Sequence, residues 1–328
     1  MNSIRVCLLV LLCSVPSVRA EDQEPSPLAF LEPLIGGHWL TDARLPGGEP
    51  IRTRVTYRYG FAKQFVRGRV YTLTDKGDYL TYETLFFFDP EKKHVAALTF
   101  SAQGAISRGV ARPGKPGMIE MRTPRSANLP MMRQEYAFTP GVTDAYTGRN
   151  YFDRGGAWVQ VMETKSKRRA DPPIGKPLRL REPSEWLRPL VRLIGGRWEI
   201  TGTMGGRELD GFTRYEWSLH PTVIESKTVM RNPGPEHTVY VAFQYFDPAA
   251  KRLRFLSFSP TGMKVAVVTV RPDVLHYEYT EHTAAGPVRY KEEHRFLDDD
   301  TIKWKVNKLD GKNWVEFASD MTARRVRD

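Results

Sequence analysis

The sequence predicts an all-β protein built from two consecutive antiparallel up-and-down β-barrels. Leu-Ile-Gly-Gly-x-Trp occurs twice, at Leu34–Trp39 and at Leu193–Trp198. Apolar and polar residues alternate over many short stretches, which is the pattern of half-buried strands. Turn sequences rich in Pro, Gly and Asp separate these stretches at hairpin spacing, and no long crossover intervenes. Eight to ten such strands in each half favour a closed barrel over an open sheet.

The second half of the chain repeats the first, and the matches keep the same order along their whole length. Most matches share an offset of 158 residues, and the offset falls to 156 near the end of each copy. The matched pairs include Tyr57 with Tyr215, Phe88 with Phe246, Tyr136 with His294, and Arg168 with Arg324. We therefore predict a first barrel at residues 27–169, a proline-rich linker at 170–183 and a second barrel at 184–328.

Residues 1–20 have the composition of a signal peptide. Arg5 precedes the apolar run Val6–Val15, and small residues close the segment at Val18 and Ala20. The run is too short to span a bilayer, so we expect a secreted or periplasmic protein without a transmembrane span. Both cysteines of the chain, Cys7 and Cys13, fall inside this segment. The mature protein would then have no disulfide, thiolate nucleophile or cysteine metal ligand.

The chain is basic, with a net charge of +11 at pH 7. Its cations are scattered through the strand patterns, apart from the runs at residues 165–169 and 323–327. This distribution favours a solubility role and predicts no nucleic-acid partner. A weak association with anionic membrane surfaces is the alternative that these runs leave open.

The elements follow the same order in each copy. A short apolar stretch of helical character opens the domain, at residues 27–35 and 184–194, and is placed to cover one barrel end. Gly37 and Gly196 allow a close backbone approach where the first strand enters. The strands that follow carry aromatic residues at period two, as in the stretch Tyr215–Leu219.

These motifs resemble bacterial lipocalin-like domains of unknown function, in the calycin group, and more distantly nitrobindin. The shared features are the Gly-x-Trp of the first strand and the later Phe-Asp-Pro that begins at Phe88 and at Phe246. The resemblance implies that Trp39 and Trp198 pack across the closed barrel ends under an arginine. The candidate arginines are Arg168 or Arg169 and Arg324 or Arg325, and we assign the role to Arg168 and Arg324.

Aromatic walls with a few polar groups are typical of a pocket for a small apolar or aromatic ligand. A filled core would give the same pattern, and the sequence does not separate the two. The candidate ligand-binding residues are Tyr57, Tyr59, Phe86, Phe88, Tyr136, Tyr215, Trp217, Phe243, Tyr245, His276, His294 and Trp304. Phe65 and Phe100 are further interior candidates.

A weaker constellation of His276, Glu278 and His294 could serve acid–base catalysis in the second barrel. The same histidines are the only candidates for a haem or zinc ligand, and we expect neither cofactor nor a metal site. Signatures of hydrolases, phosphate loops and dinucleotide sites are missing from the sequence. We therefore expect a non-enzymatic ligand-binding protein. The alternatives are an enzyme that uses this His/Glu pair, and an envelope interaction module with filled barrels.

Overall fold

The computed structural model describes residues 26–44, 48–75, 77–125, 130–139, 141–170, 185–219, 221–232, 234–260, 262–283 and 286–327. The predicted signal peptide and all of the predicted linker except residue 170 lie outside these ranges. Within them, no helix has the length and apolar character that a membrane crossing requires.

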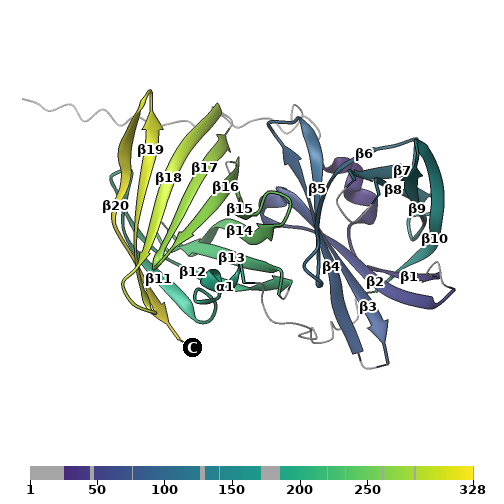
Figure 1. Cartoon of the computed structure of the whole chain (residues 1–328), viewed down its shortest axis with the longest axis horizontal. Helices are drawn as coiled ribbons and strands as arrows, with labels where there is room; N and C mark the ends of the chain where they lie inside the picture. Colours follow the sequence, from purple (N-terminus) through teal and green to yellow (C-terminus); the bar gives the residue numbers. More distant parts are fainter. Residues whose placement is uncertain are drawn as a thin grey trace, which may run out of the picture.

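The chain forms two closed antiparallel ten-stranded barrels that lie side by side (Figure 1). Each strand pairs with the next along the chain, and the first strand of each barrel also pairs with the last. The all-β, tandem-barrel prediction is confirmed. The strands of barrel 1 are β1 (His38–Arg44), β2 (Pro50–Tyr59), β3 (Phe65–Thr74), β4 (Gly77–Asp89), β5 (His94–Ser101), β6 (Ile106–Pro113), β7 (Met118–Thr123), β8 (Met132–Phe138), β9 (Ala145–Arg154) and β10 (Ala157–Arg169).

Barrel 2 repeats this topology strand for strand. Its strands are β11 (Arg197–Met204), β12 (Arg207–Leu219), β13 (Val223–Met230), β14 (His237–Asp247), β15 (Arg252–Ser259), β16 (Gly262–Arg271), β17 (Val274–Thr283), β18 (Gly286–Phe296), β19 (Thr301–Asp310) and β20 (Asn313–Val326). A short helical segment precedes each barrel, a 3-10 helix at Ala29–Leu34 and α1 at Arg188–Val191.

A buried tryptophan closes one end of each barrel beneath its helical segment. Trp39 is 0% exposed and donates its indole N–H to the carbonyl of Leu34 at 2.9 Å. Trp198 is 1% exposed and donates in the same way to Leu193 at 2.7 Å. The indole therefore fixes the helical cap while its ring fills the base of the barrel.

The glycine two residues before each tryptophan is required by its backbone conformation and by the lack of space for a side chain. Gly37 has φ +64°, and a Cβ atom there would lie 2.8 Å from the carbonyl oxygen of Arg169. Gly196 has φ +71°, and its Cβ would lie 2.5 Å from the carbonyl oxygen of Val326. Any other residue would strain the backbone and push the last strand away from the first.

An arginine from the last strand covers each tryptophan. The guanidinium of Arg168 lies 4.6 Å from the Trp39 ring and donates to the carbonyl of Ile35 at 2.9 Å. In barrel 2 the residue is Arg325, whose guanidinium lies 4.4 Å from the Trp198 ring, so the assignment to Arg324 is wrong. Arg324 is exposed. The cause is an extra bulge in β20, where Asp320 has φ +53° and the register against β11 shifts by one residue.

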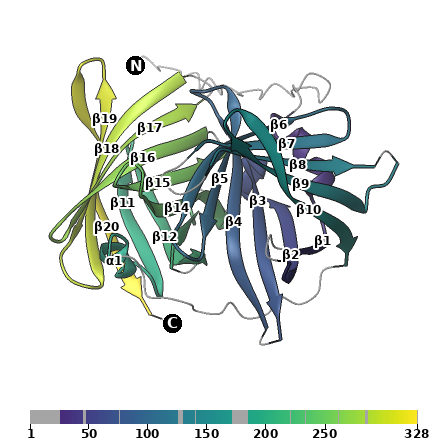
Figure 2. The ribbon, with the colours of Figure 1, turned by 45° about the vertical axis from the view of Figure 1, so that its right-hand side comes forward.

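The barrels contact each other through the same outer face of each copy, as Figures 1 and 2 show for β4 and β5 beside β14 and β15. One buried apolar cluster joins them, and its aligned pairs all share the offset of 158. The pairs are Phe65/Val223, Leu85/Phe243, Phe87/Tyr245, Leu98/Leu256 and Phe100/Phe258.

One ring contact in this cluster occurs twice, in symmetry-related positions. The rings of Phe87 and Phe258 lie 5.7 Å apart, and the equivalent rings of Phe100 and Tyr245 lie 5.0 Å apart. A pseudo-two-fold axis therefore relates the barrels, as in the isologous interface of a homodimer. Arg67 and Glu225 are aligned with each other and form an ion pair at 2.8 Å, which places them at this axis.

A fully buried carboxylate accompanies that ion pair. Glu83 is 0% exposed, accepts hydrogen bonds from the Ser218 hydroxyl at 2.8 and 3.0 Å, and pairs with Arg69 at 3.0 Å. The guanidinium of Arg67 also lies near this carboxylate, with Arg67 Nε 3.6 Å from Glu83 Oε1. Ser218 belongs to barrel 2, so this network ties the two domains through charge as well as apolar packing.

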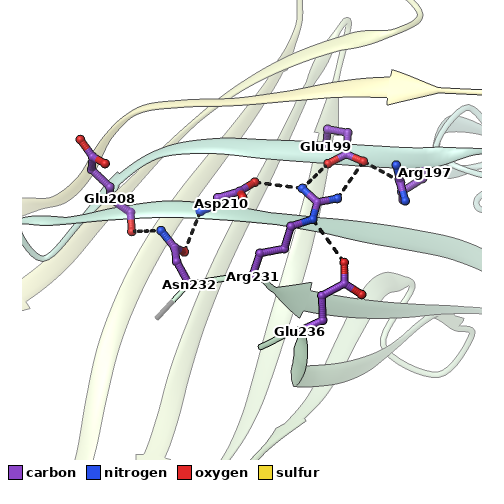
Figure 3. A network of polar contacts seen from close by, with 7 residues as sticks. All are labelled: Arg197, Glu199, Glu208, Asp210, Arg231, Asn232 and Glu236. Atoms are coloured by element: carbon purple, nitrogen blue, oxygen red, sulfur yellow. Dashed lines mark hydrogen bonds and ion pairs between the residues drawn. The ribbon is translucent and has the colours of Figure 1, made fainter. Parts of the chain in front are cut away.

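Charge pairs also hold one outer loop of barrel 2 in place, as Figure 3 shows. Arg231, just after β13, contacts Glu199 at 2.8 Å, Asp210 at 2.9 Å and Glu236 at 3.3 Å. The hydrogen bonds that Arg231 donates to Glu199 and Asp210 raise the pKa of its guanidinium above the ordinary value, and Glu199 contributes most. This network fixes the β13–β14 connection against β11 and β12.

Candidate functional site

The inner face of barrel 2 carries a hydrogen-bonded acid–base pair. Glu292 and His294 are two positions apart on β18, so both side chains point into the barrel. His294 Nε2 lies 2.5 Å from Glu292 Oε1, and the two side chains are 10% and 19% exposed. The hydroxyl of Tyr279, on the adjacent strand β17, also hydrogen-bonds to Glu292.

Aromatic rings extend from this pair around the wall. His294 stacks on Trp304 of β19, with ring centres 5.1 Å apart and planes within 15°. On its other side, the His294 ring lies 4.9 Å from Tyr277 of β17. Tyr277 in turn meets Phe255 of β15 at 5.5 Å. These contacts form a continuous aromatic band inside barrel 2.

Opposing effects set the pKa of Glu292. Burial alone would raise it, but the charge and hydrogen bond of His294, with help from Lys264 and Tyr279, lower it below its ordinary value. Glu292 is therefore ionised at neutral pH. Lys264 lies 3.7 Å from Glu281, so both inward-pointing carboxylates of β17 and β18 have a basic partner.

Tyrosines surround the carboxylate of Glu292. Burial, followed by the charges of neighbouring tyrosines and of Glu292, raises the pKa of Tyr215 well above its ordinary value. Burial likewise raises the pKa of Tyr240 to about 12 and that of Tyr277 still further. These hydroxyls stay protonated at neutral pH and can act as hydrogen-bond donors.

Several inward-facing side chains of barrel 2 keep accessible surface, although they lie within a closed wall. Tyr215, Tyr240, Glu292 and Trp304 are all only partly buried. A ten-stranded barrel is wider than the eight-stranded kind whose interior side chains just fill it. These side chains of barrel 2 therefore remain in partial contact with solvent.

Barrel 1 has a different interior at the aligned positions. Tyr57, Tyr136 and Tyr146 lie together, and burial raises the pKa of each hydroxyl. Gln134 stands where barrel 2 has Glu292, and it donates to Asn150 at 2.7 Å. The charged acid–base pair is thus a feature of barrel 2.

The structure brings most of the predicted ligand-binding residues to the barrel interiors. Tyr57, Phe86 and Tyr136 belong to the core region of barrel 1, and Tyr59 packs at its edge. The inward-facing residues of barrel 2 are Tyr215, Trp217, His294 and Trp304. Phe88 is 37% exposed at the end of β4.

Four predicted interior residues lie in the contact between the barrels instead. Phe243 and Tyr245, with Phe65 and Phe100, lie in the apolar cluster between the barrels. The interior placement was wrong because the outer face of β14 is covered by the other barrel and is as apolar as its inner face. Alternation of polar and apolar residues cannot then show which face points inward.

The predicted catalytic trio is divided by the barrel wall. His276 faces outward, 3.7 Å from Glu293, and Glu278 pairs with Arg289 on the same outer face at 2.8 Å. Only His294 points inward, and its partner is Glu292. The sequence signal for the pair of Glu292 and His294 was their separation by two positions, which places both side chains on one face of the strand.

Within the described ranges, no group of three or more His, Cys, Asp and Glu side chains is arranged to hold a metal ion. The pair of Glu292 and His294 offers two donors, of which the histidine nitrogen is already bound to the carboxylate.

No family model matches the chain, and no curated protein matches it. The solved structures that are similar to the chain at a low level include the following three. A protein of unknown function from the DUF3598 family of Nostoc punctiforme is 15% identical, with a TM-score of 0.21 over 92% of this chain and 100% of that one. Kievitone hydratase of Nectria haematococca is 9% identical, with a TM-score of 0.16 over 89% and 90% of the two chains.

The third structure is a mutant of transferrin binding protein B from Haemophilus parasuis. It is 7% identical, with a TM-score of 0.16 over 88% of this chain and 75% of that one. At such TM-scores the similarity carries no argument about function. The site must therefore be interpreted from its own geometry.

Proposed function

We propose that this protein binds a small, largely apolar or aromatic ligand inside its barrels, with barrel 2 as the principal site. The observation that supports this most is the hydrogen-bonded Glu292–His294 pair, set in an aromatic band that remains partly open to solvent. Pockets for small molecules combine apolar walls with a few placed polar groups, as this interior does. Export to the periplasm or the medium, and weak contact with anionic membranes, stay predictions from the sequence.

Native mass spectrometry of the protein purified from its own cell tests the proposal. We expect an adduct of defined mass that is lost or reduced in Glu292→Gln, while Gln134→Leu in barrel 1 serves as the matched control. Empty barrels together with no binding of any apolar fluorescent probe would contradict the proposal.

The same pair supports acid–base catalysis as a second candidate function. A histidine bonded to a carboxylate at 2.5 Å can accept and return a proton, and the tyrosine hydroxyls around it can stabilise developing negative charge. This alternative predicts turnover that His294→Ala abolishes while the circular dichroism spectrum stays unchanged. A binding protein would show no turnover on any substrate panel.

A further inference from the structure

Two buried polar atoms on the inner face of barrel 2 lack a hydrogen-bond partner among the residues that the structure describes. They are the carbonyl oxygen Oε1 of Gln244 and the indole Nε1 of Trp304. Gln244 is only 1% exposed, and its neighbours across the strands, Ile224 and Phe255, belong to the barrel 2 core region. Buried polar groups are normally paired, so these two atoms indicate a polar partner inside the barrel.

Gln244 and Trp304 stand at the two ends of the aromatic band. Gln244 pairs with Phe255, and from there the band runs through Tyr277 and His294 to Trp304. Strands β14 and β19 are five apart in a ring of ten, so the two ends lie on opposite walls. A molecule held along the band can therefore approach one of these atoms from either end.

The hydrogen-bonding groups of the site define what that molecule must offer. Gln244 Oε1 requires a donor, and the Trp304 N–H requires an acceptor. Glu292 accepts from His294 and Tyr279, which leaves lone pairs on its carboxylate for one more donor. A hydroxyl group both donates and accepts, so it suits all three positions.

The charges of the site disfavour an ionic ligand. Glu292 is paired with His294, and Glu281 lies 3.7 Å from Lys264. A carboxylate ligand would place a second negative charge near Glu292 and would bring no donor for Gln244. An ammonium ligand would bring no acceptor for Trp304 and would compete with His294 for the carboxylate.

We propose that barrel 2 selects uncharged, hydroxylated aromatic molecules of the phenol or naphthol class. The aromatic ring packs against the band formed by Phe255, Tyr277 and His294, and a hydroxyl group pairs with Gln244, Glu292 or Trp304. This inference rests on the proposed ligand-binding function and specifies its ligand class.

A matched set of three probes tests the class at neutral pH by isothermal titration calorimetry on the full chain. The probes are 2-naphthol, naphthalene, which lacks the hydroxyl, and 2-naphthoate, which carries an anion. We expect 2-naphthol to bind at least about tenfold more tightly than either of the others, because a site with unpaired polar groups rejects analogues that cannot pair with them.

Two variants connect that preference to the residues. Trp304→Phe keeps an aromatic ring and removes the N–H, and Gln244→Met keeps the side-chain length and removes the acceptor. Because 2-naphthol carries one hydroxyl and the two residues lie on opposite walls, at least one of the two variants should reduce the preference for 2-naphthol over naphthalene severalfold while naphthalene affinity changes little. Tyr146→Phe, at the position of barrel 1 aligned with Trp304, should leave the preference unchanged, and thermal melts should show all three variants folded.

The outcomes separate the two proposals. If naphthalene or 2-naphthoate binds as tightly as 2-naphthol, the ligand class is wrong while the binding function stands. The class is equally wrong in barrel 2 if both variants keep the full preference. If no probe binds the wild-type chain, both proposals fail.

Discussion

The two barrels share their closed ends and differ at their centres. Trp39 under Arg168 and Trp198 under Arg325 have nearly the same geometry, with guanidinium-to-ring distances of 4.6 and 4.4 Å. Halfway along the barrels, barrel 1 has neutral tyrosines and an amide, whereas barrel 2 has an ionised carboxylate bonded to a histidine. The closed end is fixed by packing between the first and last strands, so both copies retain it.

Divergence at the centre has a physical basis. A side chain that borders open space can change from Gln134 to Glu292, or from Tyr136 to His294, without displacing a neighbouring strand. The charge must then be compensated locally, and the histidine of barrel 2 provides that compensation. The comparison indicates that a shared scaffold supports a polar site in one copy.

The largest expected effect tests the shared part of the comparison. Trp39→Ala and Trp198→Ala each remove a fully buried indole and its hydrogen bond to the helical cap. We expect each to lower the free energy of unfolding by about 3–5 kcal/mol. Chemical denaturation measures this, and a marked inequality between the two would show that the closed ends are not equivalent.

The next effect tests the pseudo-two-fold axis. Arg67→Glu should cost about 3 kcal/mol, because it places a carboxylate between Glu83 and Glu225. Glu225→Arg should also destabilise. Since the two positions are aligned, the double exchange rebuilds the pair with its members reversed and should recover part of the loss. If the double variant loses as much unfolding free energy as the two single variants together, the pair does not lie at the axis.

A smaller and pH-dependent effect separates the barrel centres. The folded-state pKa of Glu292 is lowered, so its carboxylate stabilises the protein above the ordinary glutamate pKa and this contribution fades as pH falls through the lowered value. Glu292→Gln should lower the free energy of unfolding by about 1–2 kcal/mol at neutral pH. It should also make that free energy depend less on pH in the acidic range.

Gln134→Glu in barrel 1 is the matched change. Among the described residues, a tyrosine (Tyr136) is aligned with His294, so the buried carboxylate should have a raised pKa and should reduce stability as pH rises. Denaturation midpoints from about pH 3 to pH 8 would show the two opposite slopes. Parallel slopes would contradict the assigned role of His294.

The smallest effect concerns the arginine over each tryptophan. Arg325→Ala should cost about 1 kcal/mol through loss of the cation–π contact and the hydrogen bond to the Arg192 carbonyl. Arg324→Ala changes an exposed neighbour and should stay within about 0.5 kcal/mol of the wild type. Equal losses would show that the bulge at Asp320 does not set the register as described.

The sequence alone determined the fold class and the duplication, whereas the closing role of the two tryptophans was implied by a family resemblance. Period-two alternation, hairpin spacing and a repeat in constant order are local properties of a chain, and they suffice to specify a meandering barrel. Gly37 and Gly196 could be interpreted in advance for the same reason, because the conformation they allow is a property of the residue type.

Only the tertiary structure decided which apolar face points inward. Phe243 and Gln244 are neighbours on β14, yet the aromatic residue is buried between the barrels and the amide points inside one. Alternation with period two assigns residues to two faces of a strand but does not show which face points into the barrel. Here the second barrel buries the outer face just as a core would. A single bulge in β20 likewise exchanged Arg324 for Arg325 at Trp198, because an inserted residue reverses the direction of the side chains that follow it.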